Sequence, residues 1–281
     1  MADHEPENTR PDDSAMTVAL VQMDSTEDVA ANVALAERLA REAARAGARF
    51  IALPEMYHFR STGKPSTLPG EPIPGPSTRG LQAIAAEFNA AILAGSICEA
   101  IAGSFKVHNT SVLIGPDGGI NATYRKIHLF DVEVDGVAIR ESDWYVPGDT
   151  PTCATVLGHT VGLSICYDLR FPELYRRYAD GRAELLTVPA SFTATSGAAH
   201  WESLLRARAI ENQAFVLAPG QTGPGSGGVM THGNSLIVDP WGVVLARGSD
   251  RGTEIVTATL DFARQAEVRR RLPALGHRRL A

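Results

Sequence analysis

Short apolar runs alternate with amphipathic segments along this chain. Residues 17–23 (TVALVQM) are apolar and rich in β-formers and predict a buried strand, as do residues 50–53 (FIAL), which end at Pro54. Between them, residues 32–46 repeat apolar positions at helical spacing and stop at Gly47, a residue typical of helix ends. This part of the chain therefore predicts a strand–helix–strand unit.

The same alternation continues to residue 260. Further strands are predicted at residues 91–99, 110–114, 122–126, 152–157, 160–165, 185–188, 215–218, 235–238, 243–246 and 253–260. Helices are predicted from a cap at Ser77 to about residue 89, after Pro172, and at 199–212. The GPDGG turn at 115–119 predicts a hairpin, whereas 63–76 and 131–151 are predicted as loops. This order predicts an α/β sandwich, with sheets in the middle and helices outside.

Composition narrows the class of protein. The 281 residues are 44% hydrophobic and 21% charged, typical of a globular protein with a large core. The net charge of −6 gives no reason to expect a nucleic-acid partner. Three cysteines without CxxC spacing predict neither a disulfide framework nor a zinc site.

The two ends of the chain are polar. Residues 1–15 are acidic and lack the apolar core of a secretory signal, so we expect a disordered tail, then one domain over 16–281 and a cytoplasmic location. No apolar run has the length of about 18 residues that spans a membrane. The basic segment RRRLPALGHRR near the C-terminus is expected to be a solvated helix and tail.

Cys166 is the first candidate for chemistry. It follows the apolar run VGLSI and precedes a predicted helix, a position that projects a side chain into the crevice above a sheet. The same turn can aim the backbone N–H of Tyr167 at a developing oxyanion. Position alone does not separate a nucleophile from a buried structural cysteine, whereas Cys98 and Cys153 lie within strand-like runs and are expected to be structural.

Two charged residues occupy comparable positions. Glu55 comes directly after the strand FIALP, and Lys126 ends the predicted strand ATYRK. A buried carboxylate can act as a base for the Cys166 thiol, and an ammonium group can favour the thiolate and stabilise an oxyanion. A surface carboxylate and a solvated lysine remain the alternatives for either residue by itself.

Together the motifs around these residues resemble the nitrilase superfamily of carbon–nitrogen hydrolases. The matching segments are ALPEMY, YRKIHLFD, GLSICYDLRFPELYR and, downstream, PASFTATSGAAHWESLLRARAIENQAFVLAPGQTG and HGNSLIVDPWG. The resemblance implies a four-layer αββα sandwich, with Glu55 as general base, Lys126 as oxyanion stabiliser and Cys166 as nucleophile. It implies a thioester intermediate, no metal or organic cofactor, and a homodimer or higher homo-oligomer.

The resemblance also implies a second active-site glutamate after the lysine motif. Glu141, in the segment IRES, matches best, and Glu133 is the rival. The motif wording is most similar to the branch of deaminated-glutathione amidases and omega-amidases, which cut terminal amides of small keto acids. That likeness suggests Arg170 as a partner for a substrate carboxylate, since a guanidinium matches it bidentately, although a structural salt bridge is the equal alternative. Phe192 and Thr193 are expected to line the pocket, with Tyr167 beside them.

The sequence therefore predicts an amidohydrolase that releases ammonia from a small carboxylic-acid amide. An N-carbamoyl amino acid amidohydrolase or a nitrilase would use the same residues. A non-catalytic scaffold of the same fold is the alternative from another class, and the intact Glu, Lys and Cys argue against it. A cysteine protease would pair its cysteine with His and Asn, and the sequence shows no such arrangement. The Gly-rich segment 220–228 is a candidate for a loop that closes over the site.

Overall fold

The computed structural model describes residues 14–63 and 66–280, and its strands form two six-stranded sheets. The first sheet has the order β14 (Glu254–Asp261), β1 (Ala15–Gln22), β2 (Phe50–Ala52), β3 (Ala91–Ala100), β4 (Val107–Ile114) and β5 (Ile120–Arg125). The second has the order β13 (Val244–Arg247), β12 (Leu236–Val238), β11 (Phe215–Ala218), β10 (Leu185–Thr187), β9 (His159–Leu163) and β8 (Thr152–Val156). In both sheets the central strands are parallel and the flanking strands pair antiparallel.

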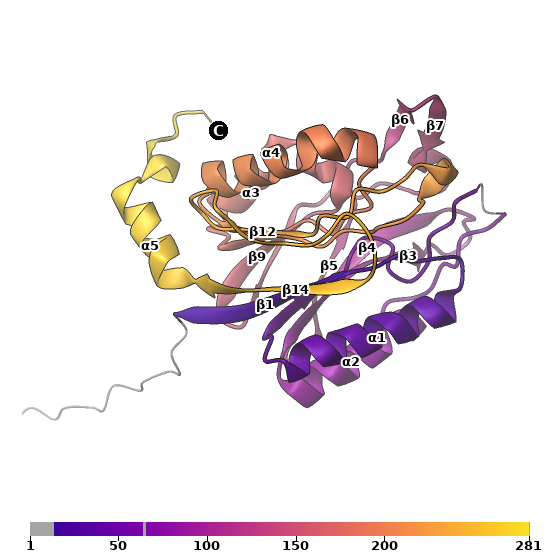
Figure 1. The fold of residues 1–281 in the computed structure, drawn as a ribbon, viewed down its shortest axis with the longest axis horizontal. Helices are drawn as coiled ribbons and strands as arrows, with labels where there is room; N and C mark the ends of the chain where they lie inside the picture. Colours follow the sequence, from indigo (N-terminus) through magenta and orange to yellow (C-terminus); the bar gives the residue numbers. More distant parts are fainter. Residues whose placement is uncertain (1–13, 64–65, 281) are drawn as a thin grey trace, which may run out of the picture.

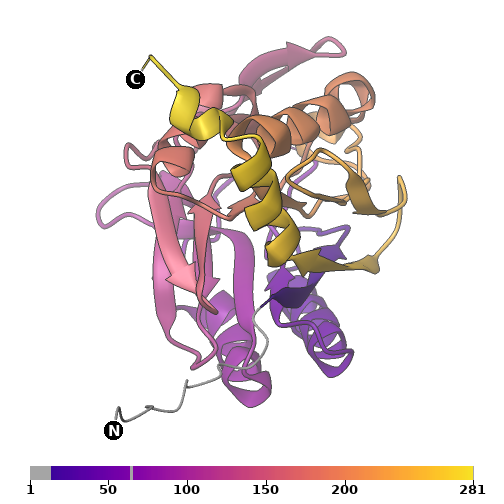
Figure 2. The ribbon, with the colours of Figure 1, turned by 90° about the vertical axis from the view of Figure 1, so that its left-hand side faces the viewer.

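Helices cover the outer face of each sheet, which gives four layers (Figure 1). Helices α1 (Val29–Arg45) and α2 (Pro76–Phe88) lie on the first sheet, and α3 (Pro172–Asp180) and α4 (Ala194–Asn212) lie on the second. Helix α5 (Phe262–Arg271) follows β14 and runs past the end of the sandwich, as Figure 2 shows. The predicted αββα sandwich is confirmed.

The strand sequences are continuously apolar because both faces of the central strands are buried. In β1, Val18 and Leu20 belong to the core that lies between the sheets, whereas Ala19 and Val21 belong to the core beneath α1 and α2. Buried parallel strands are typically uninterrupted runs of this kind, without polar alternation. The core between the sheets also contains Cys166, so the candidate nucleophile lies where the two sheets meet.

Several element boundaries differ from the prediction. Helix α2 begins at Pro76, and its N-cap is Gly75; Ser77 is not the cap, because its N–H and hydroxyl bind Glu71. Helix α4 begins at Ala194, five residues before the predicted start. Strand β1 begins at Ala15, which the sequence placed in the tail, and residues 1–13 of that tail lie outside the described residues.

The prediction of loop over 131–151 is wrong in part. Strands β6 (Asp131–Val134) and β7 (Val137–Arg140) form a two-stranded hairpin, and a 3-10 helix, η1 (Glu141–Asp143), follows. Asp135 and Gly136 both have positive φ at the hairpin turn. An Asp-Gly pair between alternating residues is a strong hairpin signal, and it was readable in the sequence VEVDGVAIR.

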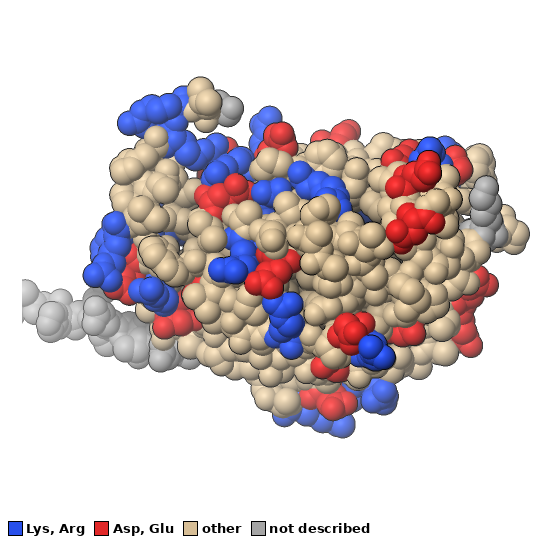
Figure 3. Space-filling view, turned by 45° about the horizontal axis from the view of Figure 1, so that its top comes forward, with Lys and Arg blue, Asp and Glu red and all other residues tan. Residues whose placement is uncertain are grey.

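Acidic and basic side chains are mixed over the face drawn in Figure 3, without a large area of one sign. Near the C-terminus several arginines have acidic partners: Arg271 pairs with Glu267, and Arg278 pairs with Asp180. Within residues 14–63 and 66–280, no helix has the length and hydropathy needed to cross a bilayer.

Candidate active site

The structure brings Glu55, Lys126, Cys166 and Glu141 together at one edge of the sandwich. Glu55 and Lys126 follow β2 and β5 of the first sheet, and Cys166 begins the 3-10 helix η2 (Cys166–Arg170) after β9 of the second. Glu141 begins η1, directly after the β6–β7 hairpin. All four line one pocket. The rival, Glu133, lies exposed on β6, so Glu141 is the second glutamate of this cluster.

Lys126 bridges the two carboxylates. Its Nζ lies 2.9 Å from an oxygen of Glu55 and 2.9 Å from an oxygen of Glu141, and its side chain is 1% exposed. Burial by itself lowers the pKa of Lys126, but the charges of Glu141 and Glu55 outweigh it, and the pKa lies well above its ordinary value. Burial raises the pKa of Glu141, which the Lys126 ammonium partly offsets. Lys126 therefore stays a cation at neutral pH.

Glu55 is held at both carboxylate oxygens. Asn109 Nδ2 donates to Oε1 at 3.0 Å, beside the lysine, and the backbone N–H of Ser191 donates to Oε2 at 2.8 Å. Gln221 Nε2 donates to the backbone carbonyl of Glu55 at 2.9 Å. These contacts fix the carboxylate in one orientation. Sequence reasoning missed Asn109, Ser191 and Gln221, because no motif marks them as partners of a residue so far away in the chain.

Cys166 lies at a strained turn between β9 and η2. Its φ of 48° is in the left-handed region that residues other than glycine rarely adopt, and its N–H donates to the Pro189 carbonyl at 2.9 Å. The bonds of η2 begin at the N–H of Asp168, so the Tyr167 N–H lies in the first turn, where helices leave donors unused. The turn thus presents a thiol and an amide N–H next to each other.

The thiol is protonated at rest. Burial raises the pKa of Cys166 well above its ordinary value, the Glu55 carboxylate raises it further, and Lys126 lowers it only in part. Lys126 acts in the expected direction and lowers the pKa of the thiol, but the negative charge of Glu55 and desolvation outweigh the ammonium. Reaction at this thiol requires a base that takes its proton, and Glu55 is the carboxylate that lines the same pocket and whose charge raises the pKa of the thiol most.

The buried carboxylate of Asp168 holds the turn that carries Cys166. Asp168 is fully buried and accepts hydrogen bonds from Tyr124 Oη at 2.7 Å, from His128 Nδ1 at 2.7 Å and from the Ile165 N–H at 2.8 Å. His128 thus belongs to this support, although it follows Lys126 closely in sequence. The contacts join the segment after β5 to the segment after β9, which carries Cys166.

Of the other predicted pocket residues, only Thr193 lines the pocket within the described chain. Arg170 packs over the rings of Tyr167 and Phe192 and hydrogen-bonds to His200. It is therefore no partner for a carboxylate at Cys166. The physical reason is the 3-10 geometry of η2: with about three residues per turn, a residue four positions after Cys166 points to a different side. Phe192 is buried against Trp201, and the Tyr167 ring contacts Phe130 and Phe171.

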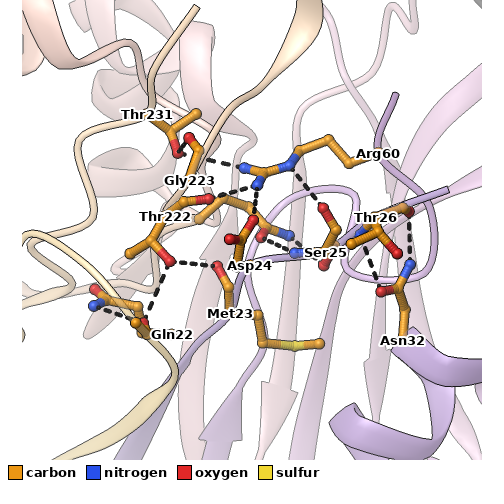
Figure 4. A network of polar contacts seen from close by, with 12 residues as sticks. Gln22, Met23, Asp24, Ser25, Thr26, Asn32, Arg60, Thr222, Gly223 and Thr231 are labelled. Atoms are coloured by element: carbon orange, nitrogen blue, oxygen red, sulfur yellow. Dashed lines mark hydrogen bonds and ion pairs between the residues drawn. The ribbon is translucent and has the colours of Figure 1, made fainter. Parts of the chain in front are cut away.

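Arg60 anchors the loop 220–228, which lines the pocket together with Cys166 (Figure 4). Arg60 is 1% exposed and follows β2, and its guanidinium donates to Asp24 at 2.6 Å, to the Ser25 carbonyl at 3.2 Å and to the Thr222 carbonyl. It also contacts Thr231 Oγ1 at 3.4 Å. Residues 220–228 therefore have anchored flanks, and Gly225 and Ser226 form part of the pocket wall.

The arrangement suits acyl transfer. A nucleophile, a carboxylate base, a buried cation and a backbone N–H converge on one pocket, and these are the parts that nucleophilic catalysis requires. Among the residues that the structure describes, no group of His, Cys, Asp and Glu side chains has the arrangement of a metal site.

Comparisons with known proteins agree with this geometry. Residues 17–270 match the family model of the carbon–nitrogen hydrolases. The chain is 39% identical over 275 residues to the omega-amidase NIT2 of Homo sapiens, covering 95% of this chain and 96% of that protein. It is 40% identical over 264 residues to the deaminated glutathione amidase of a Synechocystis strain, covering 92% and 97%.

Solved structures give the same result. Nit3 of Saccharomyces cerevisiae, described as a member of branch 10 of the nitrilase superfamily, superposes with a TM-score of 0.80 at 29% identity, covering 92% of this chain and 95% of that one. The family resemblance predicted from the motifs is thus confirmed. The chain belongs to the carbon–nitrogen hydrolase family of the nitrilase superfamily and is an enzyme that hydrolyses carbon–nitrogen bonds other than peptide bonds.

Proposed function

We propose that this protein is a cysteine-dependent amidase that releases ammonia from the amide of a small carboxylic acid through a thioester. The observation that carries the proposal is that one pocket is lined by the Cys166 thiol and by the buried Glu55 carboxylate, which lies 2.9 Å from the Lys126 ammonium. A base, a nucleophile and a fixed cation are thereby held around a single pocket.

In the first half-reaction, Glu55 takes the thiol proton as the sulfur of Cys166 attacks the carbonyl carbon. A carbon–sulfur bond forms, and the carbonyl oxygen becomes an oxyanion, which Lys126 Nζ and the Tyr167 N–H stabilise. Glu141 keeps Lys126 oriented and charged. When the carbon–nitrogen bond breaks, Glu55 returns its proton to the leaving nitrogen, and ammonia departs.

In the second half-reaction, Glu55 takes a proton from water, and the resulting hydroxide attacks the thioester carbon. The carbon–sulfur bond breaks, the carboxylic acid is released, and the thiolate regains a proton from Glu55. The base therefore acts twice, and no co-reactant other than water is needed. The named activities of the relatives make terminal amides of small keto acids the first substrates to try.

The test is ammonia release from a panel of amides. The panel contains α-ketoglutaramate, deaminated glutathione, simple aliphatic amides, N-carbamoyl amino acids and nitriles. Wild type is compared with Cys166→Ala and with the control Cys153→Ala, which changes an exposed free cysteine. We expect release from at least one amide that Cys166→Ala abolishes and Cys153→Ala leaves unchanged. Release confined to N-carbamoyl compounds or nitriles would replace the amidase by that activity.

The intermediate gives an independent readout. In Glu55→Gln the base that activates water is absent, so a reactive acyl donor should leave an acyl group on Cys166, visible as a mass increase on the peptide that contains it. The treated Cys166→Ala protein should show none. An acyl group on Cys98 or Cys153 alone would contradict the assignment of the nucleophile.

A further inference from the structure

The two carboxylate oxygens of Glu55 have different surroundings. Lys126 Nζ at 2.9 Å and Asn109 Nδ2 at 3.0 Å both donate to Oε1, whereas the Ser191 N–H donates to Oε2 at 2.8 Å. Each oxygen of an ionised carboxylate has two lone pairs that accept hydrogen bonds. From the described part of the chain Oε1 thus accepts two hydrogen bonds and Oε2 accepts one, which leaves a lone pair of Oε2 for a proton.

Oε2 is also the oxygen that is bound from the side of the nucleophile. Ser191 follows β10 of the second sheet, and two residues before it the Pro189 carbonyl accepts the Cys166 N–H at 2.9 Å. Ser191 and Cys166 both line the catalytic pocket. Asn109 and Lys126, in contrast, bind Oε1 from the first sheet. The segment that holds Oε2 is therefore the one that also holds the backbone of the nucleophile.

Asn109 is placed beside Lys126 by strand pairing. It lies on β4 and is 1% exposed, and its backbone carbonyl accepts the Lys126 N–H at 2.8 Å. The two side chains thus start from paired strands and meet at Glu55 Oε1. Among the described residues that line the catalytic pocket, Lys126 is included and Asn109 is not. Asn109 therefore acts on the carboxylate from behind the pocket wall and touches no substrate.

The other end of the Asn109 amide is unpaired. Oδ1 is buried and has no hydrogen-bond partner within the residues that the structure describes. A buried acceptor without a partner destabilises a fold, and most buried polar atoms are paired. A leucine has nearly the same shape and would leave no such acceptor. What the asparagine adds at this position is the hydrogen bond from Nδ2 to the carboxylate.

We propose that Asn109 is a positioning residue of the amidase reaction, and that Glu55 takes and returns protons at Oε2. This proposal rests on the proposed function and names the atom through which its base acts. Asn109 and Lys126 occupy Oε1 and stabilise negative charge there. Oε2 takes the thiol proton and passes it to the leaving nitrogen, and it later takes a proton from water and passes it to the thiolate. The carboxylate is regenerated after each transfer.

The first test changes the Asn109 donor with little change in side-chain size. Asn109→Leu has no amide, and Asn109→Asp places a second carboxylate beside Glu55. Both variants should lower kcat for the best amide of the panel at least about tenfold, as expected for the loss of one hydrogen bond to a charged group, and should change KM by less than about twofold.

The matched control is Thr110→Val. Thr110 is the next residue on β4, is fully buried, and also donates to a carboxylate, since its Oγ1 lies 2.8 Å from Glu99. Successive side chains of a strand point to opposite faces, so this carboxylate lies outside the site. Thr110→Val should lower the urea midpoint as Asn109→Leu does, and it should keep the kcat of wild type.

The pH dependence of kcat/KM separates positioning from a purely structural role. A donor to a carboxylate favours its charged form, and a neighbouring carboxylate disfavours it. The acid limb of the profile should therefore move to higher pH in Asn109→Leu and further in Asn109→Asp, whereas Thr110→Val keeps the limb of wild type. The other charged and titratable groups whose charges interact with Glu55 are the same in all four proteins: Lys126, Glu141, Cys166, Arg60 and Tyr145.

A crystal structure of acylated Glu55→Gln tests the assignment of the oxygen and needs no Asn109 variant. The water next to the thioester should lie within hydrogen-bond distance of the side-chain atom that faces Ser191, and out of reach of the atom that faces Asn109. This experiment decides the matter even if both Asn109 variants fail to fold.

Three results would overturn the proposal: a wild-type kcat in either Asn109 variant, a lower kcat with an unmoved acid limb, or a water bound at the atom that faces Asn109. In each case, ammonia release that Cys166→Ala abolishes would leave the proposed amidase function intact. If no amide gave ammonia in a Cys166-dependent manner, the proposed function itself would fail, and the role of Asn109 would fail with it.

Discussion

Replacement of Arg60 by methionine should destabilise the protein and loosen one wall of the catalytic pocket. Methionine has a similar length but no donors, so the Ser25 and Thr222 carbonyls both lose the guanidinium. Burial lowers the pKa of Arg60 to about 10, which still leaves it protonated at neutral pH. The substitution therefore removes a buried cation together with its hydrogen bonds.

The size of the loss in stability depends on whether each group that Arg60 binds can find another hydrogen-bond partner in the variant. The two carbonyls are buried, and an orphaned buried acceptor costs about 1–3 kcal/mol. The Asp24 side chain is 46% exposed and regains water, so its loss of partner adds little. Methionine also avoids the desolvation of a guanidinium, which offsets part of the loss. We expect the free energy of unfolding to fall by about 2–5 kcal/mol.

Urea denaturation followed by circular dichroism measures this change. The matched control is Arg251→Met, since Arg251 is 85% exposed and pairs with its neighbour Asp250; the urea midpoint of that variant should equal that of wild type. KM for the best amide should also rise in Arg60→Met. Arg60 contacts Thr231 and anchors the loop that carries Ser226, and both of these residues line the pocket. A loss of stability no greater than that of the control would refute the reasoning.

Three further predictions concern the site and its support. Because burial and Glu55 raise the pKa of Cys166, the thiolate absorbance of wild type minus Cys166→Ala should not appear below pH 9; an ionisation near pH ~8.5, the ordinary value, would contradict this. Glu141→Gln should lower kcat for ammonia release about 100-fold, because it removes one of the two charges that hold Lys126; a change under threefold would show that Glu141 is dispensable. Tyr124→Phe should lower the free energy of unfolding by about 1.5–3 kcal/mol in urea denaturation, because it takes a donor from the buried Asp168 carboxylate, and an unchanged midpoint would count against that contact.

The position of residues relative to strands indicated candidates for the centre of the site, and the resemblance to the nitrilase superfamily gave each of them a role. Glu55, Lys126 and Cys166 each follow an apolar run, and strand ends in α/β sheets are where side chains gather around ligands. The apolar runs themselves are readable because the central strands are buried on both faces. A charged residue directly after such a run therefore stands out, even in a single sequence.

The partners of these residues were not readable in the same way. Asn109 lies 54 positions from Glu55, and Ser191 lies 136 positions away and contributes only its backbone N–H. Nothing in the local pattern of either segment encodes which carboxylate it will face, since that depends on how the strands are ordered and packed. Arg170 shows the opposite case: the likeness to the amidase branch suggested that its guanidinium binds a substrate carboxylate, with a structural role as the alternative, and in the structure it packs over Phe192 and hydrogen-bonds to His200.

The contacts between the two sheets decide the geometry of the reaction. Glu55 and Lys126 belong to the first sheet, whereas Cys166 belongs to the second, so the distance between base and nucleophile is set by sheet packing and by no single loop. Ser191 and Gln221, both from the second half of the chain, bind the carboxylate and backbone of Glu55. Catalytic groups must be held within about 0.5 Å of their working positions. Arg60 touches no reacting atom, but it belongs to the description of the site because it joins the segment after β2 to the loop that faces the nucleophile.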